Sequence, residues 1–271
     1  MIDAHAHCCG VYLNEKTTIE HLDKNGFEKV ILCAGEPEGS FDYHHPMLSD
    51  IFKNENTGFN FNSFIEAASK LKHLPSLIEG ENLKIASLSR LFPDRILAAY
   101  CIDPTDPKWQ QKAETDFERH RYCMIKLHQC WHDFDIASRL FDELVIWAKK
   151  RRLPIFLHLK NAEQALYFTA AANRHCDAVF IVAHCLGFDI IDNALKSNNV
   201  YFDLSSPQLY SADTLRKAYI KYGAERLIFA SDAPYGRNNP QIIFDRLEKL
   251  WLSQEEFDLI THQNICRILN I

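Results

Sequence analysis

The sequence lacks the features that mark membrane, secreted and nucleic-acid-binding proteins. No apolar stretch reaches the roughly 18 residues that a membrane helix needs. The first residues, Met-Ile-Asp-Ala-His, show no basic start followed by an apolar run, so we expect no signal peptide. Lysine and arginine form no stripe and the formal net charge is -6, which argues against a nucleic-acid surface. These absences predict a cytoplasmic protein that binds neither a membrane nor nucleic acid.

Cysteine pairs at metal-binding spacing are lacking as well. The nine cysteines include no CxxC pair, and the adjacent Cys8 and Cys9 do not have the spacing of a zinc knuckle. Unpaired cysteines in a chain of this length are typical of a reducing cytosol, so we expect free thiols. Cys33, Cys101 and Cys185 stand in or beside apolar runs, which predicts that they pack in the core.

The sequence does contain eight short apolar runs rich in β-branched residues, and helical patterns separate them. Such runs are typical of parallel strands covered on both faces. The predicted strands are 1–7, 29–34, 96–102, 124–128, 155–159, 179–184, 200–204 and 227–232. The predicted helices are 18–25, one or two within 64–91, 109–120, 136–152, 162–174, 190–197, 212–222, 240–250 and 255–269. This alternation predicts one (β/α)8 TIM-barrel domain over residues 1–271, with an open doubly wound sheet as the alternative.

One connection, residues 35–62 after the second predicted strand, is longer than the others. It is rich in aromatic residues, glycine, asparagine and histidine. Connections of this length are usually functional or disordered. Because it follows the carboxyl end of a strand, we expect it to lie over the barrel mouth as a lid. His44 and His45 within it raise the idea of a second metal site, but a polar lid is the better interpretation.

Four histidines and one aspartate fall at the carboxyl ends of predicted strands. His5 and His7 are two residues apart in the first strand, so their side chains share a face. His158 ends the fifth strand, His184 the sixth and Asp232 the eighth. Barrel active sites lie at this end. Any one of these histidines alone is better explained as structural, and it is their joint placement that favours a metal site.

These residue types suit a metal that activates water. Neutral imidazole and carboxylate bind Zn, Mn or Fe, and a catalytic site keeps an open position for water. Such a metal lowers the pKa of water from about 15.7 toward about 7, and a histidine or aspartate that does not ligate takes the proton. We therefore predict a divalent metal cofactor, with zinc as the leading candidate.

Further charged residues are candidates for substrate binding and support. Lys126 and His128 share a face of the fourth strand. Lys126 would bind a substrate anion or, if carboxylated, bridge two metals, and a lysine at the barrel rim is the alternative. Arg237, after the eighth strand, is another candidate for a substrate carboxylate. Asp3 shares the face of His5 and either supports a metal ligand or makes a structural hydrogen bond. The other histidines are expected at the surface: His21, His73, His120, His132, His175 and His262.

Several segments resemble the amidohydrolase superfamily, specifically its amidohydrolase-related (amidohydrolase 2) branch of metal-dependent hydrolases and decarboxylases. These segments are IDAHAH, PDRILAAYCIDP, MIKLH, LPIFLH, FIVAHCLG, VYFDLSS, LIFASDAPYG and NICRIL, and they span nearly the whole chain. The HxH motif together with the ASDAPYG-like turn is specific when the two occur in this order. The strand-four segment lacks the GEIGLD-like acidic pattern of TatD-type nucleases. Similarity to those nucleases is therefore the less favoured interpretation.

The resemblance also implies roles for individual residues. The implied metal ligands are His5, His7, His158 and Asp232. His184 is implied as the residue that steers or deprotonates water, and Asp232 as a proton shuttle where it ligates weakly. The family has a proline after the strand-four histidine, whereas this chain has Gln129. We therefore expect residues 129–134 to be shaped differently.

Three functions stay open at this point. The first is hydrolysis of a small ester, lactone or amide by metal-activated water, with His184 or Asp232 handling the proton. The second is non-oxidative decarboxylation of an aromatic or unsaturated carboxylic acid on the same metal. The third is a non-catalytic metal-binding barrel. The partner in the first two is a small-molecule substrate, and a homodimer stays open as the assembly.

Overall fold

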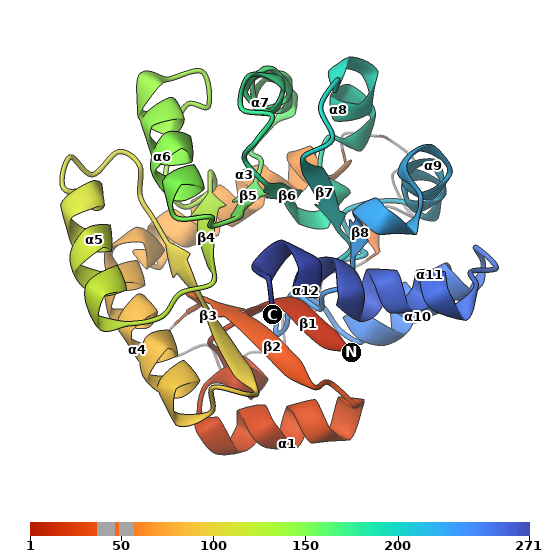
Figure 1. Cartoon of the computed structure of the whole chain (residues 1–271), viewed down its shortest axis with the longest axis horizontal. Coiled ribbons are helices and arrows are strands. Elements are labelled where there is room, and N and C mark those ends of the chain that lie inside the picture. Colours follow the sequence, from red (N-terminus) through yellow and green to blue (C-terminus); the bar gives the residue numbers. More distant parts are fainter. Residues whose placement is uncertain (37–46, 49–56) are drawn as a thin grey trace.

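The computed structural model describes residues 1–36, 47–48 and 57–271. Eight parallel strands follow one another in sequence order, with helices around them (Figure 1). The strands are β1 (Ile2–His7), β2 (Lys29–Cys33), β3 (Ile96–Cys101), β4 (Met124–His128), β5 (Ile155–His158), β6 (Phe180–Val182), β7 (Val200–Asp203) and β8 (Leu227–Ile228). The predicted (β/α)8 TIM barrel is confirmed. A doubly wound sheet would reverse its strand order at a switch point, and this order has no reversal.

The barrel closes through backbone hydrogen bonds between β1 and the chain that follows β8. The backbone N–H of Asp232 donates to the carbonyl oxygen of His5 at 2.8 Å, and that of His7 donates to Ala233 at 2.8 Å. The chain therefore continues beside β1 after the strand itself has ended. This closure places Asp232 next to the HxH motif.

The helices alternate with the strands as predicted. They are α1 (Glu15–Asn25), α3 (Thr57–Leu71), α4 (Ile78–Leu91), α5 (Trp109–Arg119), α6 (Arg139–Lys150), α7 (Ala162–Arg174), α8 (Phe188–Ala194), α9 (Ala212–Tyr222), α10 (Asn239–Glu248), α11 (Gln254–Asp258) and α12 (Asn264–Leu269). The shorter turns are η1 (Gly10–Tyr12), η2 (Leu74–Leu77), η3 (Ala183–Cys185), η4 (Ala224–Arg226) and the π-helical η5 (Leu259–Gln263). None of the described helices is long and apolar enough to cross a membrane.

The local sequence explains several of these boundaries. The side chains of Asn14, Ser138 and Asn161 accept hydrogen bonds from backbone N–H groups at the starts of α1, α6 and α7. Gly26 ends α1 in the left-handed conformation, with a φ of 68°. Every residue of β1, β4 and β5 is buried, as expected for strands covered on both faces.

The structure differs from the prediction in three places. The helix expected over 255–269 is interrupted by η5. The connection expected over 35–62 ends early because α3 begins at Thr57, and its centre, with His44 and His45, lies outside the described residues. The sixth and eighth strands stop before His184 and Asp232. These two residues have φ values of 56° and 59°, which no strand accommodates.

Helix α3 covers the carboxyl end of the barrel. In Figure 1 it lies behind the strands, whereas α12 lies in front of them. The side-chain amide of Asn62 donates to the carbonyl oxygens of Leu159 and Lys160, both at 2.8 Å, just beyond β5. A Cβ at Gly58 would collide with the side chain of Leu186, so the approach of α3 requires glycine there.

Candidate metal centre and active site

A cavity of about 350 Å³ lies at the carboxyl ends of the strands, under α3. Its polar lining includes the sequence-predicted residues His7, Lys126, His128, His158, His184 and Asp232. One wall is a single face of α3, since Phe61, Phe64, Ile65 and Ala68 are spaced three and four residues apart. His5 is fully buried, two residues deeper in β1 than His7. Arg237 is exposed and does not line the cavity, so its role in substrate binding stays a prediction.

His5, His7 and Asp232 come together closely enough to share a cation. One potential ligand atom from each lies within 4.8 Å of those of the other two. The Nε2 atoms of His7 and His5 lie 3.3 Å and 3.6 Å from Oδ1 of Asp232. His184 approaches the other carboxylate oxygen, with its Nε2 atom 4.0 Å from Oδ2. Two rings from β1 and one from the turn after β6 thus surround one carboxylate.

The ring of His7 is oriented by a backbone carbonyl. Its Nδ1 atom lies 2.6 Å from the carbonyl oxygen of Ala34. A carbonyl oxygen only accepts hydrogen bonds, so Nδ1 carries a proton. Nε2 is then the nitrogen that faces Asp232, and metal-binding histidines likewise donate their other ring N–H to a group such as a backbone carbonyl.

Asp203 and Ser205 orient the other two rings. The Ser205 hydroxyl donates its one proton to Asp203, so Oγ can only accept from the rings around it. Nδ1 of His184 lies 2.9 Å from this oxygen, and Nδ1 of His5 lies 3.3 Å from it. Both rings therefore carry their proton on Nδ1, and both have a lone pair on Nε2. One hydroxyl group thus fixes the tautomers of two histidines.

The charges at this centre are those of a metal-binding donor set. Burial lowers the pKa of His5, and the neighbouring Lys126 lowers it further. Burial also lowers the pKa of His184, although Asp232 and Asp203 oppose that shift. Burial alone would raise the pKa of Asp232, but His184, His7 and the Ser206 hydroxyl hold it well below its usual value. The lowered pKa values of His5 and His184, next to an ionised carboxylate, fit a divalent cation.

Lys126 is buried at the same centre. Its side chain is 1% exposed, which excludes the alternative of a lysine at the barrel rim. Nζ donates to Nε2 of His5 at 2.8 Å and lies 4.2 Å from the centroid of the Phe156 ring. Among the described residues, no carboxylate oxygen lies within 4.0 Å of this ammonium group. A buried cation without a carboxylate partner is suited to an anionic ligand.

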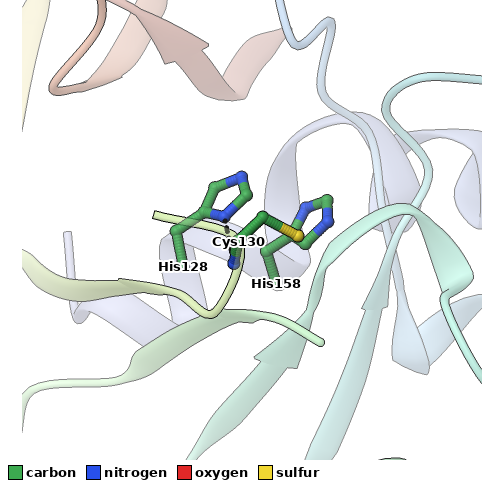
Figure 2. Close-up of side chains that lie close together, drawn as sticks. All are labelled: His128, Cys130 and His158. Carbon is green, nitrogen blue, oxygen red and sulfur yellow. Dashed lines mark hydrogen bonds between the residues drawn. The ribbon is translucent and has the colours of Figure 1, made fainter. Parts of the chain in front are cut away.

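His158 lies at a second group of side chains. Its ring stacks on that of His128 with centroids 4.0 Å apart, and its Nε2 atom lies 2.8 Å from Oδ1 of Asn62. Its Nδ1 atom is buried without a hydrogen-bond partner among the described residues. One potential ligand atom each of His128, Cys130 and His158 lies within 4.8 Å of the others (Figure 2). His158 is implied as the fourth ligand of the first centre, and it also belongs to this second group of possible ligands.

Asp3 supports the centre indirectly. Its carboxylate accepts from the backbone N–H of Ser231 at 2.8 Å, from its hydroxyl at 2.6 Å, and from Tyr12 at 2.9 Å. Burial raises its pKa to about 6, although these hydrogen bonds oppose the shift. Asp3 thus holds the turn that carries Asp232.

Three residues of the site were not predicted from the sequence: Asp203, Ser205 and Asn62. Asp203 ends β7 at the barrel mouth, and the strand-end rule applied to the other histidines and aspartates would have found it. Ser205 and Asn62 gave no signal, because their roles depend on partners distant in sequence. The prediction that all remaining histidines lie at the surface was wrong for His132 and His175, which are buried.

Comparison with known proteins places these residues in a family. A family model described as Amidohydrolase matches residues 2–271. Among solved structures, 2,6-dihydroxybenzoate decarboxylase in complex with 2,6-dihydroxybenzoate is similar at 13% identity, covering 99% of this chain and 97% of that one, with a TM-score of 0.70. A probable 2-pyrone-4,6-dicarboxylic acid hydrolase from Acinetobacter baumannii, with citric acid bound, is similar at 12% identity, covering 100% and 99%, with a TM-score of 0.69.

A putative amidohydrolase from Staphylococcus aureus is similar over the full length of both chains, at 15% identity with a TM-score of 0.68. No curated protein matches this chain. At these identities the solved structures show the shared barrel fold, whereas the family match covers almost every residue. The family also decides against the non-catalytic barrel. The chain belongs to the amidohydrolase family, and its activity is of the metal-dependent amidohydrolase type.

Proposed function

We propose that this chain is a hydrolase that cleaves a small ester, lactone or amide. His5, His7 and Asp232 would hold the divalent cation, with His158 as the fourth ligand. The observation that carries the proposal is the set of three imidazole Nε2 atoms that lie 3.3, 3.6 and 4.0 Å from the carboxylate oxygens of Asp232. Zinc suits this nitrogen and oxygen donor set.

The residues around the centre supply the remaining chemistry. A divalent cation held there would polarise a carbonyl oxygen and lower the pKa of a water molecule. Nε2 of His184, 4.0 Å from Asp232, is free to accept the proton of that water. Asp232 accepts the Ser206 hydroxyl, which fixes one carboxylate oxygen and leaves the other facing the rings.

The cavity defines the size and surroundings of the substrate. About 350 Å³ accommodates a small molecule, and the aromatic rings of Phe61, Trp131 and Tyr235 line it. Helix α3 forms one of its walls. All nine cysteines are free thiols, which supports a cytoplasmic location. The homodimer stays a prediction.

The test combines metal analysis with a substrate panel. Purified protein should contain divalent metal, and chelator treatment should abolish hydrolysis of lactones, esters or amides until zinc is restored. His7→Asn should lose both metal and turnover. Turnover that survives in metal-free protein would remove this mechanism.

A second candidate function is non-oxidative decarboxylation of an aromatic or unsaturated carboxylic acid. The observation that favours it is Lys126, a buried cation without a carboxylate partner among the described residues, beside the aromatic wall. The structural similarity to 2,6-dihydroxybenzoate decarboxylase adds support. Carbon dioxide released from a panel of hydroxybenzoates, with no lactone hydrolysis, would favour decarboxylation over hydrolysis.

A further inference from the structure

We propose that His128, Cys130 and His158 form a second cation site, which binds a thiophilic divalent ion such as zinc next to the first centre. Figure 2 shows the three side chains close together at the carboxyl ends of β4 and β5. All three are buried, with exposures of 7%, 2% and 1%. Two imidazoles and one thiolate are the donors that zinc prefers.

Strand register brings the two imidazoles together. His128 and His158 are direct partners in the parallel pairing of β4 with β5, so their side chains project from adjacent strands at the same level. Their rings are nearly parallel, 10° apart. Trp131 stacks on the other face of His128 at 4.5 Å and holds that ring in place.

The turn after β4 then brings the sulfur to the two rings. The backbone N–H groups of Trp131 and His132 both donate to the carbonyl oxygen of His128 at 3.0 Å, which folds the chain back at Cys130. The backbone N–H of Gln129 donates to the carbonyl oxygen of His158 at 3.2 Å. Proline, which the family has at this position, has no N–H and could not make this bond. The departure at Gln129 thus ties the cysteine-bearing turn to β5.

The hydrogen bonds indicate which atoms are available to a cation. Asn62 occupies Nε2 of His158, and the buried Nδ1 atom of that ring has no partner among the described residues. Cys130 is a free thiol, and cation binding would release its proton to solvent. Nδ1 of His128 accepts from the backbone N–H of Cys130 at 3.2 Å, so His128 joins only by giving up this bond or by moving its ring proton. His128 is therefore the weakest of the three ligands.

The site is reached from the cavity, because His128 and His158 line it. His158 is also the proposed fourth ligand of the first centre, so with two ions bound His5, His7 and Asp232 would hold the first one alone. The first centre contains no sulfur, so a sulfur ligand to a bound cation reports the second site alone. The second site can therefore be tested whether or not the protein is a hydrolase.

The test is a titration of metal-free full-length protein with Co²⁺ alone. Cobalt binding is measured by the sulfur-to-cobalt charge-transfer absorption band. The wild-type protein should develop this band, and Cys130→Ser should abolish it. Cys176→Ser, which changes an exposed cysteine, should keep it. His128→Asn should weaken cobalt binding about tenfold. Asp232→Asn should keep the band while losing turnover, which separates this site from the proposed activity.

A wild-type protein without the band, or a band that persists in Cys130→Ser, overturns the proposal. X-ray absorption of the wild-type protein loaded with Cd²⁺ gives a check that needs no variant. One sulfur ligand around cadmium supports the site, and a shell of nitrogen and oxygen only overturns it.

Discussion

The two sides of the barrel mouth carry the same residue types but organise them differently. On the side of β1, β6 and β8, the rings of His5, His7 and His184 each have Nδ1 within hydrogen-bonding distance of an oxygen atom. On the side of β4 and β5, the rings of His128 and His158 stack on each other, and one buried nitrogen has no partner among the described residues. The rings of the first side are oriented by hydrogen bonds at Nδ1, whereas on the second side ring stacking adds to the hydrogen bonds of His128 and His158.

This difference shows what decides the role of a buried histidine. A ring whose proton is fixed by an oxygen acceptor presents a lone pair in a defined direction, which favours one cation geometry. On the second side, Nε2 of His158 donates to Oδ1 of Asn62, whereas Nδ1 of His128 accepts from the backbone N–H of Cys130, so the lone pair of one of the two rings is already engaged. We expect the first side to bind its cation more tightly and to tolerate substitution less.

The largest effect is expected from the carboxylate at the centre of the first side. Asp232→Asn keeps the shape of the side chain but removes its charge, so turnover should fall by about 10³-fold and the metal content should fall with it. Elemental analysis and steady-state kinetics measure both. The matched control is Asp213→Asn at an exposed position of α9, which should keep full activity. Wild-type metal content in the Asp232 variant would show that this side is not the cation centre.

The next effect concerns the hydroxyl that orients two rings. Ser205→Ala removes the hydroxyl acceptor of Nδ1 in both His5 and His184, and leaves His184 only the Ser205 backbone carbonyl at 3.2 Å. Metal affinity should therefore fall by 10–100-fold, roughly the effect of losing a group that orients ligands. Competition with a chelator measures this affinity. Ser87→Ala on α4, where the hydroxyl bonds only the carbonyl of Leu83, is the control. An unchanged affinity would mean that tautomer fixation contributes nothing.

Lys126 lies between the two sides, and its charge is expected to act on the substrate. Lys126→Met keeps the length of the side chain without the ammonium group. KM for a carboxylate substrate should rise by about tenfold, as expected for one lost charge-assisted hydrogen bond. A neutral lactone should be affected far less. Lys16→Met, at a position with 80% side-chain exposure, is the control. An equal loss for charged and neutral substrates would contradict an anion-binding role.

The smallest effect is expected at the contact between α3 and the second side. Asn62→Ala removes hydrogen bonds to His158 and to two backbone carbonyls, so the free energy of unfolding should fall by about 1–3 kcal/mol. Urea denaturation measures it. Asn60→Ala, exposed on the same helix, should change it little. Equal stability of the two variants would contradict the conclusion that the hydrogen bonds of Asn62 hold α3 in place.

The sequence was sufficient for the barrel and for the positions of most site residues, because both follow from local patterns. An apolar run predicted β4 to the residue, and amphipathic helical patterns did the same for α7 and α9. The HxH spacing placed His5 and His7 on one face. The left-handed turns at His184 and Asp232 could not be predicted, since neither is glycine. The hydrogen bonds of Ser205 reach rings 21 and 200 positions away, and no local pattern reports contacts at such separations.

The predicted metal ligands and one wall of the cavity belong to different elements, which matters for engineering the specificity of this protein. The groups that would hold the cation stand on strands or on the turns directly after them, whereas one cavity wall is a single helix face. A combinatorial library at Phe61, Phe64 and Ile65 could reshape that wall without disturbing the ligands. Gly58 and Asn62 would need to stay constant, because glycine allows the close approach of the helix and Asn62 bonds it to the chain after β5. Selection for new specificities could therefore act on one short segment.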